Sequence, residues 1–181
     1  MISRRSALLS LMGAAAAVAL PRRAQASIAR AVTLKELSAD SQISVVGTAL
    51  DAQSRWETVA GRKRIVTTTR LRVNETIAGS APGAELLVRT LGGQVGDVGQ
   101  VVHGEALLLI GEDSVLFLAD IGGGEHAVSA MAQGHYPIRG TLRPSPRLSE
   151  LRGVAGSAVQ DLVGQSLSEA RRRIQGAWRA R

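Results

Sequence analysis

The chain has 181 residues and a formal net charge of +7, with 45% hydrophobic residues, 2% aromatic residues and no cysteine. The missing cysteine excludes disulfides, thiolate metal sites and a cysteine nucleophile, so stability must come from apolar burial. Residues 1–26 hold four arginines and no acid, which leaves +3 for the rest: about +4 in residues 166–181 and −1 in the body. A near-neutral body with four scattered aromatic rings argues against binding of nucleic acids or sugars.

Residues 1–26 have the pattern of an export signal. Ser3-Arg4-Arg5 places a charged pair before an apolar run at 7–20, which is shorter than the roughly 20 apolar residues that span a bilayer. Ala24-Gln25-Ala26 supplies the small residues that a signal peptidase reads. We therefore expect a signal peptide that is cleaved before Ser27.

The signal resembles those of the twin-arginine (Tat) export pathway, whose pattern is S-R-R-x-F-L-K. It departs from the pattern at Ala7 and Leu9. The weak apolar run and the basic pair Arg22-Arg23 fit the Tat resemblance. A Sec signal and a retained N-terminal anchor are the alternatives. With either a Tat or a Sec signal, we expect the mature protein to be periplasmic or secreted.

The mature chain opens with a short predicted helix and then changes to the period of a strand. Thr33 and Glu36 form a capping-box pattern for a helix that ends near Ser41. From Ile43 to Leu50 the period is about two residues, and a glycine inside such a strand, here Gly47, often marks a bulge.

The clearest predicted strand covers residues 64–74, after a turn at 60–63. Its alternation is typical of a half-buried antiparallel strand. The face expected to point inward holds Ile65, Thr67, Thr69, Leu71 and Val73, and the outward face holds Thr68, Arg70, Arg72 and Asn74. Strands are also expected at 85–91 and 127–131, and two apolar runs, 106–111 and 114–120, read as a further closely spaced pair.

These elements predict a mainly β fold, specifically a small antiparallel OB-like barrel, with a β-sandwich as second choice. A short N-terminal helix and a C-terminal helix accompany it. We expect a β-barrel domain at 27–140, a linker or weak helix at 141–165, and a basic C-terminal helix at 166–181, which Ser166 and Glu169 open as a second capping-box pattern.

Residues 92–104 form a glycine-dense loop between predicted strands. Its spaced glycines resemble a dinucleotide-binding loop, but no helix is predicted to follow and no Walker lysine is present, so nucleotide binding is not expected. A long loop in a compact domain is commonly functional, which makes this one the candidate binding edge. The candidate binding residues are Gly92, Gly93, Gln94, Val95, Gly96, Val98, Gly99 and Val101.

Catalytic and metal sites receive little support. Glu125-His126 and His135 could meet across a hairpin and hold a metal, but no i, i+2 or i, i+4 ligand pair supports this. No serine lies in a G-x-S-x-G turn. We expect no catalytic residue, metal or other cofactor, while a hydrolase with a non-motif site near His103, His126 and His135 is the alternative.

Arg171-Arg172-Arg173, Arg179 and Arg181 make the C-terminal helix basic. A solvated helix end, where positive charge complements the helix dipole, is the expected role. Weak contact of residues 171–181 with anionic lipid, or contact with an acidic partner, is the alternative.

Several landmarks between residues 34 and 139 occur in this order: Leu34-x-x-Leu37, Val46-Gly47-Thr48, Ser54-Arg55-Trp56-Glu57, the strand from Thr67 to Val73, Gly92-Gly93-Gln94-Val95-Gly96, apolar strands around Phe117, and Ala132-Gln133-Gly134. In these landmarks the chain resembles an uncharacterised family of exported bacterial proteins. The resemblance implies an OB-like fold and carries no catalytic residues with it.

The sequence therefore predicts an exported, non-catalytic module that binds another exported protein through loop 92–104. The barrel alone suggests an analogy with netrin/TIMP-like inhibitors, and so a companion or inhibitor of an exported protease. The cysteines with which that family grips a catalytic metal are missing here, so that mechanism cannot apply.

Overall fold

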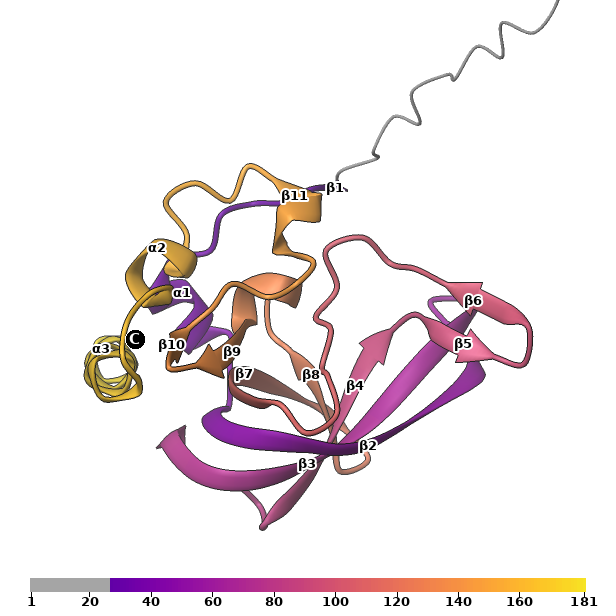
Figure 1. Cartoon of the computed structure of the whole chain (residues 1–181), viewed down its shortest axis with the longest axis horizontal. Coiled ribbons are helices and arrows are strands. Elements are labelled where there is room, and N and C mark those ends of the chain that lie inside the picture. Colours follow the sequence, from indigo (N-terminus) through magenta and orange to yellow (C-terminus); the bar gives the residue numbers. More distant parts are fainter. Residues whose placement is uncertain (1–26) are drawn as a thin grey trace, which may run out of the picture.

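The computed structural model describes residues 27–181, shown as a cartoon in Figure 1. The predicted signal peptide, residues 1–26, lies outside the described residues. The fold is mainly β, as predicted. The strands of its main sheet are β2 (Ile43–Val59), β3 (Arg62–Gly79), β4 (Glu85–Leu91), β7 (Asp113–Gly122), β8 (Glu125–Val128), β9 (His135–Arg139) and β10 (Thr141–Leu142).

The sheet has the order β10-β9-β7-β2-β3-β4-β8, and β7 also pairs with β8. The pairings β7–β2–β3–β4–β8–β7 therefore form a closed circuit. The expectation of purely antiparallel pairing is wrong, because β4 and β8 run parallel. The other four pairs of the circuit are antiparallel. Direction cannot alternate around a circuit of five strands, so one pair has to be parallel.

β2 and β3 form one long antiparallel ribbon, joined at Ala60-Gly61. β2 pairs with β7 only through its first six residues, 43–48. The pairing of β2 with β3 shifts register between Val46 and Gly47, which confirms the predicted bulge. A Cβ atom at residue 47 would lie 2.7 Å from the Leu71 side chain, so Gly47 also gives room to a core leucine.

The alternation predicted for residues 64–74 is confirmed over 69–74 and fails at 65–68, where Val66 is as buried as Ile65 and where Thr67 and Thr68 are both half-buried. Ile65 and Leu71 are fully buried, whereas Arg70 and Arg72 are exposed; Val73 is only half-buried. Leu71 belongs to an apolar cluster enclosed by the strand circuit. The buried members of this cluster are Ile43, Val45, Leu71, Leu86, Val88, Ala106, Leu116, Leu118 and Val128.

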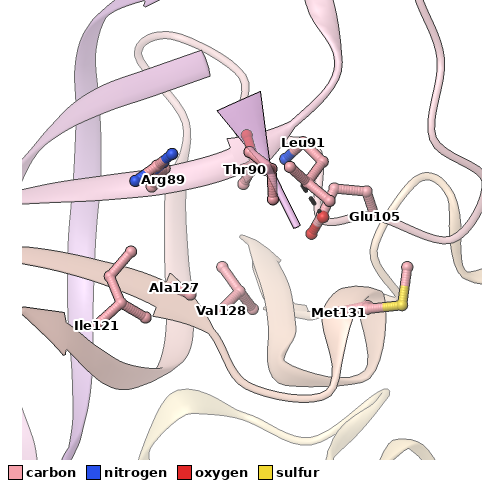
Figure 2. Close-up of a pocket in the computed structure, with 9 residues that line it drawn as sticks. Arg89, Thr90, Leu91, Glu105, Ile121, Ala127, Val128 and Met131 are labelled. Atoms are coloured by element: carbon pink, nitrogen blue, oxygen red, sulfur yellow. Dashed lines mark hydrogen bonds between the residues drawn. The ribbon is translucent and has the colours of Figure 1, made fainter. Parts of the chain in front are cut away.

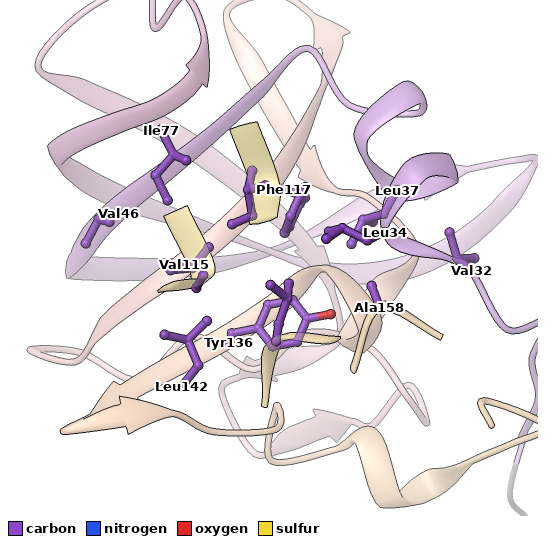
Figure 3. Packing of buried hydrophobic residues seen from close by; sticks show 13 residues of the cluster. Val32, Leu34, Leu37, Val46, Ile77, Val115, Phe117, Tyr136, Leu142 and Ala158 are labelled. Carbon is purple, nitrogen blue, oxygen red and sulfur yellow. The ribbon is translucent and has the colours of Figure 1, made fainter. Parts of the chain in front are cut away.

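A second apolar cluster joins the sheet to the helices. Phe117 and Tyr136 meet edge to face in it, with ring centroids 6.3 Å apart (Figure 3). The helices are α1 (Leu34–Ala39), α2 (Ala158–Leu162) and α3 (Leu167–Arg179). Leu37 from α1 and Ile174 from α3 are both fully buried in this cluster.

The capping box predicted at the start of α1 is present in full, whereas the one predicted at α3 is only half formed. The capping box of Thr33 and Glu36 is present at α1. At α3 the Ser166 hydroxyl accepts the Glu169 N–H. None of the helices in residues 27–181 combines the length and the apolar character needed to cross a bilayer.

The apolar run at 106–111 is not the strand that the sequence predicted. It runs as irregular chain from β6 (Val98–Gln100) toward β7, with Ala106 buried and Ile110 exposed. Residues 141–165 hold β10, two short helical segments, η2 (Leu148–Glu150) and α2, and β11 (Leu151–Arg152), which pairs with β1 (Ser27–Ile28). This stretch supplies buried residues to the clusters beneath the helices.

Candidate functional site

The glycine-dense loop folds into a small hairpin. β5 (Gly93–Val95) pairs with β6 (Val98–Gln100), so that Val95 faces Val98 across a turn at Gly96-Asp97. The hairpin lies at the end of the molecule opposite the three helices, beside the far part of the β2–β3 ribbon (Figure 1).

Hydrogen bonds fix this hairpin to β3. The Gly92 N–H donates to the Ile65 carbonyl over 2.8 Å, and the Ile65 N–H donates to Oε1 of Gln100 over 2.8 Å. The Thr67 hydroxyl donates to the Gly92 carbonyl over 2.6 Å. The segment is therefore held at both ends of its paired part, which presents the turn in a defined position.

The glycines of the segment have two different roles. A Cβ atom at Gly93 would lie 2.3 Å from Oγ1 of Thr67, and one at Gly104 would lie 2.0 Å from the Leu151 side chain. These two glycines allow close packing within the protein itself. At Gly99, by contrast, a Cβ would have no neighbour within 4 Å, so its backbone is open to a partner.

Six of the eight candidate binding residues are exposed: Gly93, Gln94, Gly96, Val98, Gly99 and Val101. Gly92 is buried and Val95 is half-buried. The exposed fractions of Val98 and Val101 are 51% and 60%. The structure thus keeps the predicted segment together and separates its anchoring residues from those that face solvent.

The three histidines do not form one site. His126 on β8 lies opposite Asp120, and His135 on β9 lies opposite Leu116. These partners are four residues apart along β7, a distance of about 13 Å along a strand. His103 is exposed and places Nδ1 3.3 Å from a Glu150 carboxylate oxygen. Within residues 27–181, no group of three or more histidine, aspartate and glutamate side chains could hold a metal ion.

His135 is fully buried and bound on both ring nitrogens. Nδ1 lies 2.9 Å from the Ser145 hydroxyl, and Nε2 lies 3.1 Å from the Ser114 hydroxyl. Burial lowers the pKa of His135 to about 4. The ring is therefore neutral near pH 7 and ties β9 to β7 and to the chain near residue 145.

A cavity of about 340 Å³ lies at the base of the loop segment, where β4 and β8 diverge (Figure 2). Most of its lining is apolar, and one carboxylate, that of Glu105, faces it. The lining residues are Val59, Arg89, Thr90, Leu91, Glu105, Ile121, Ala127, Val128 and Met131. Its size and lining are those of a small-ligand site.

Glu105 is almost fully buried at the wall of this cavity, with an exposed fraction of 8%. Its carboxylate accepts the Leu91 N–H over 3.3 Å and the Ala106 N–H over 3.0 Å. Burial raises the pKa of Glu105, and the two backbone hydrogen bonds oppose this rise. The Leu91 contact also joins the two chain ends of segment 92–104.

At the rim of the cavity, Arg89 belongs to a network of four charged side chains. Arg89 and Arg55 each contact both Glu57 and Glu125. These two arginines and two glutamates come from β2, β4 and β8, and their charges balance. The network therefore links β2, β4 and β8 at the surface and contributes no net charge there.

Part of the basic C-terminal helix is bound to the body of the protein. Arg171 forms a two-pronged ion pair with Glu75, with both distances 2.6 Å. Arg181 donates to the carbonyls of Ser38 and Ser41. Arg172 and Arg173 both contact Glu169. These contacts account for four of the five arginines at 171–181 within the protein itself.

The sequence reasoning missed Glu105, which follows the glycine-dense segment and precedes the run Ala106–Ile110. A single acidic residue that opens an apolar run is a usable signal, because carboxylates are seldom buried without a specific partner. Met131 was missed as well. Its backbone conformation, with φ +58°, leaves no trace in the sequence.

No protein-family model matches the sequence of this chain, and no curated protein does.

Proposed function

We propose that this protein is an exported, non-catalytic binding module that contacts another exported protein through segment 92–104. The export part of the proposal rests on the signal pattern of residues 1–26. The binding part rests on the geometry of the β5–β6 hairpin.

We infer that the domain is an OB-like barrel. Support comes from the closed circuit of five strands, β2, β3, β4, β8 and β7, around one apolar cluster. OB-folds are small five-stranded barrels that bind their ligands through one sheet face and the loops beside it. The hairpin is inserted between β4 and β7, which matches such a position.

The observation that carries the binding proposal is the pair of exposed valines on an anchored hairpin. Val98 and Val101 present apolar side chains to solvent, next to the open backbone of Gly99. Anchoring to β3 lowers the entropy that a partner would have to remove on binding. An exposed strand such as β6 also offers backbone groups for pairing with a second chain.

A companion or inhibitor of an exported protease is one partner role consistent with this proposal. It rests on the barrel analogy alone. The absence of cysteine excludes inhibition by thiolate or disulfide-linked contacts to a metal.

The test replaces both exposed valines with aspartate, as Val98→Asp with Val101→Asp. Tagged wild-type and variant proteins are expressed with the signal, and bound proteins are compared quantitatively after capture from periplasm. We expect partner recovery to fall at least tenfold, because two charges would be buried at the interface, while thermal unfolding stays nearly unchanged.

The matched control is Leu109→Asp with Ile110→Asp. These two apolar residues lie outside the hairpin, and their exposed fractions are 40% and 56%. This control should retain the partner. Recovery that survives the two changes in the hairpin, or that falls equally in the control, would contradict the proposal.

A further inference from the structure

The cavity beside Glu105 exists because two strands separate. β4 and β8 pair only at residues 87–89 and 125–127. The chain then bends away from β4 through Ala130 and Met131, which have φ values of +54° and +58°. Residues with a side chain seldom adopt positive φ, and such strained backbone concentrates at ligand sites. Met131 itself lines the cavity.

The walls of the cavity suit an aliphatic group. Leu91, Ile121, Val128 and Met131 surround it, and Ile121 is 46% exposed, so apolar surface remains open to solvent there. In Figure 2 the side chains of Ile121, Val128 and Met131 lie across the space from Leu91 and Glu105. An aliphatic ligand would cover this surface.

The chemistry of the polar wall is set by Glu105. Its carboxylate accepts one hydrogen bond on each oxygen, and each oxygen has further acceptor capacity. Among the described residues, none forms a direct ion pair with it. Arg147 is near enough to act on its charge, but one of its guanidinium nitrogens donates to the Val102 carbonyl. Arg89 is bound by Glu57 and Glu125.

We propose that this cavity binds an alkylammonium group, with the ammonium on the Glu105 carboxylate and the alkyl stem against Ile121, Val128 and Met131. An ammonium would supply a positive charge in direct contact with this buried carboxylate and donors for its remaining acceptor capacity. The group has two sources, a free aliphatic amine or the lysine side chain of a peptide. The proposal is independent of binding by segment 92–104.

NMR of the methionine methyl groups reports directly on ligand binding in the cavity. The full chain has three methionines, and Met131 is the one within residues 27–181. Its ¹³C-methyl signal is assigned by its loss in Met131→Leu and followed during titration with n-hexylamine. Hexan-1-ol and heptanoate have the same six-carbon alkyl chain with neutral and anionic heads. We expect saturable shifts with the amine, at least tenfold weaker binding of the alcohol, and weakest binding of the acid.

Two variants separate the charge from the cavity. Glu105→Gln should remove the preference for amine over alcohol, and Glu85→Gln, an exposed carboxylate on β4 outside the lining, should keep it. Ala127→Leu, which narrows the cavity and leaves the carboxylate in place, should weaken both ligands. It also serves as the test if Glu105→Gln does not fold.

The source of the group is decided with a second probe, Nα-acetyl-lysine-N-methylamide. Saturation by this probe as well assigns the cavity to a lysine side chain of a peptide, and saturation by hexylamine alone assigns it to a free amine. Equal binding of amine, alcohol and acid, an unchanged preference in Glu105→Gln, or no shift of the Met131 signal would overturn the proposal.

Discussion

Acidification should destabilise this protein through His135, and the size of the effect can be worked out from its surroundings. The ring is fully buried between Ser114 and Ser145, and burial lowers the pKa of His135 from 6.5 to about 4. Over the window between these values the unfolded chain binds a proton that the folded protein does not. Stability therefore falls as pH falls from 6.5 toward 4, and its full value is present above pH 6.5.

The expected magnitude follows from the two pKa values of His135. Between pH 7 and pH 5 the free energy of unfolding should fall by about 2 kcal/mol from this residue. Two carboxylates also change the free energy of unfolding with pH, Glu36 at a lower pH than His135 and Glu105 in the opposite direction. The pKa of Glu36 is lowered to about 2, mainly by the hydrogen bond from the Thr33 N–H, so its contribution is lost as pH falls below 4.5. The raised pKa of Glu105 makes its contribution fall as pH rises.

The assay is urea unfolding of wild type and His135→Gln at several pH values between 5 and 7. Glutamine can hydrogen-bond to serine but does not titrate. The free energy of unfolding is plotted against pH for each protein, and the difference between the two slopes gives the contribution of His135. We expect the wild type to lose about 2 kcal/mol more than the variant. Equal slopes would refute the reasoning. So would an NMR titration in which the folded His135 ring becomes charged above pH 6, a measurement that does not depend on the variant folding.

The remaining predictions concern the core and export. Leu71→Ala should lower the free energy of unfolding by about 2–5 kcal/mol, because Leu71 is fully buried. Arg70→Ala should cost less than about 1 kcal/mol, because its ion pairs with Asp51 and Glu85 are exposed; equal costs in chemical denaturation would contradict this strand assignment. Replacing Arg4 and Arg5 with lysine should block removal of the signal peptide, because Tat export depends on the arginine pair. Unchanged processing in pulse-chase labelling would indicate a Sec signal.

Local patterns in the sequence predicted local structure well. Alternation gave the buried face of β3 over residues 69–74, and Gly47 marked a bulge, because both features depend on neighbouring residues. The direction of the β4–β8 pair depends on how the whole circuit closes, which no local period records. The run at 106–111 has the composition of a buried strand, yet it joins no ladder among the described residues and meets the sheet at Gly111, whose N–H donates to the Ala49 carbonyl, a long-range contact that no local period records.

The sequence predicted a glycine-rich segment between strands but not how its residues are arranged. Glycine density located the segment at 92–104, and the turn at Gly96-Asp97 allowed it to pair with itself as a hairpin. The sequence contained no sign of which glycines serve internal packing, because Thr67 and Ser54, which crowd Gly93, lie far from it along the chain. The cavity beside Glu105 likewise arises where β4 and β8 part, which is a property of the assembled sheet.

The parallel contact that closes the strand circuit has a consequence for folding. β8 has four residues, and its partners in β4 come about 40 residues earlier in the chain. Until β8 docks, β4 keeps one unpaired edge, and such an edge can recruit a strand from another molecule. Long-range pairing of this kind forms slowly. Docking of β8 therefore protects residues 87–89 of β4 from pairing with another molecule, and the Arg89–Glu125 contact helps to hold β8 in that place.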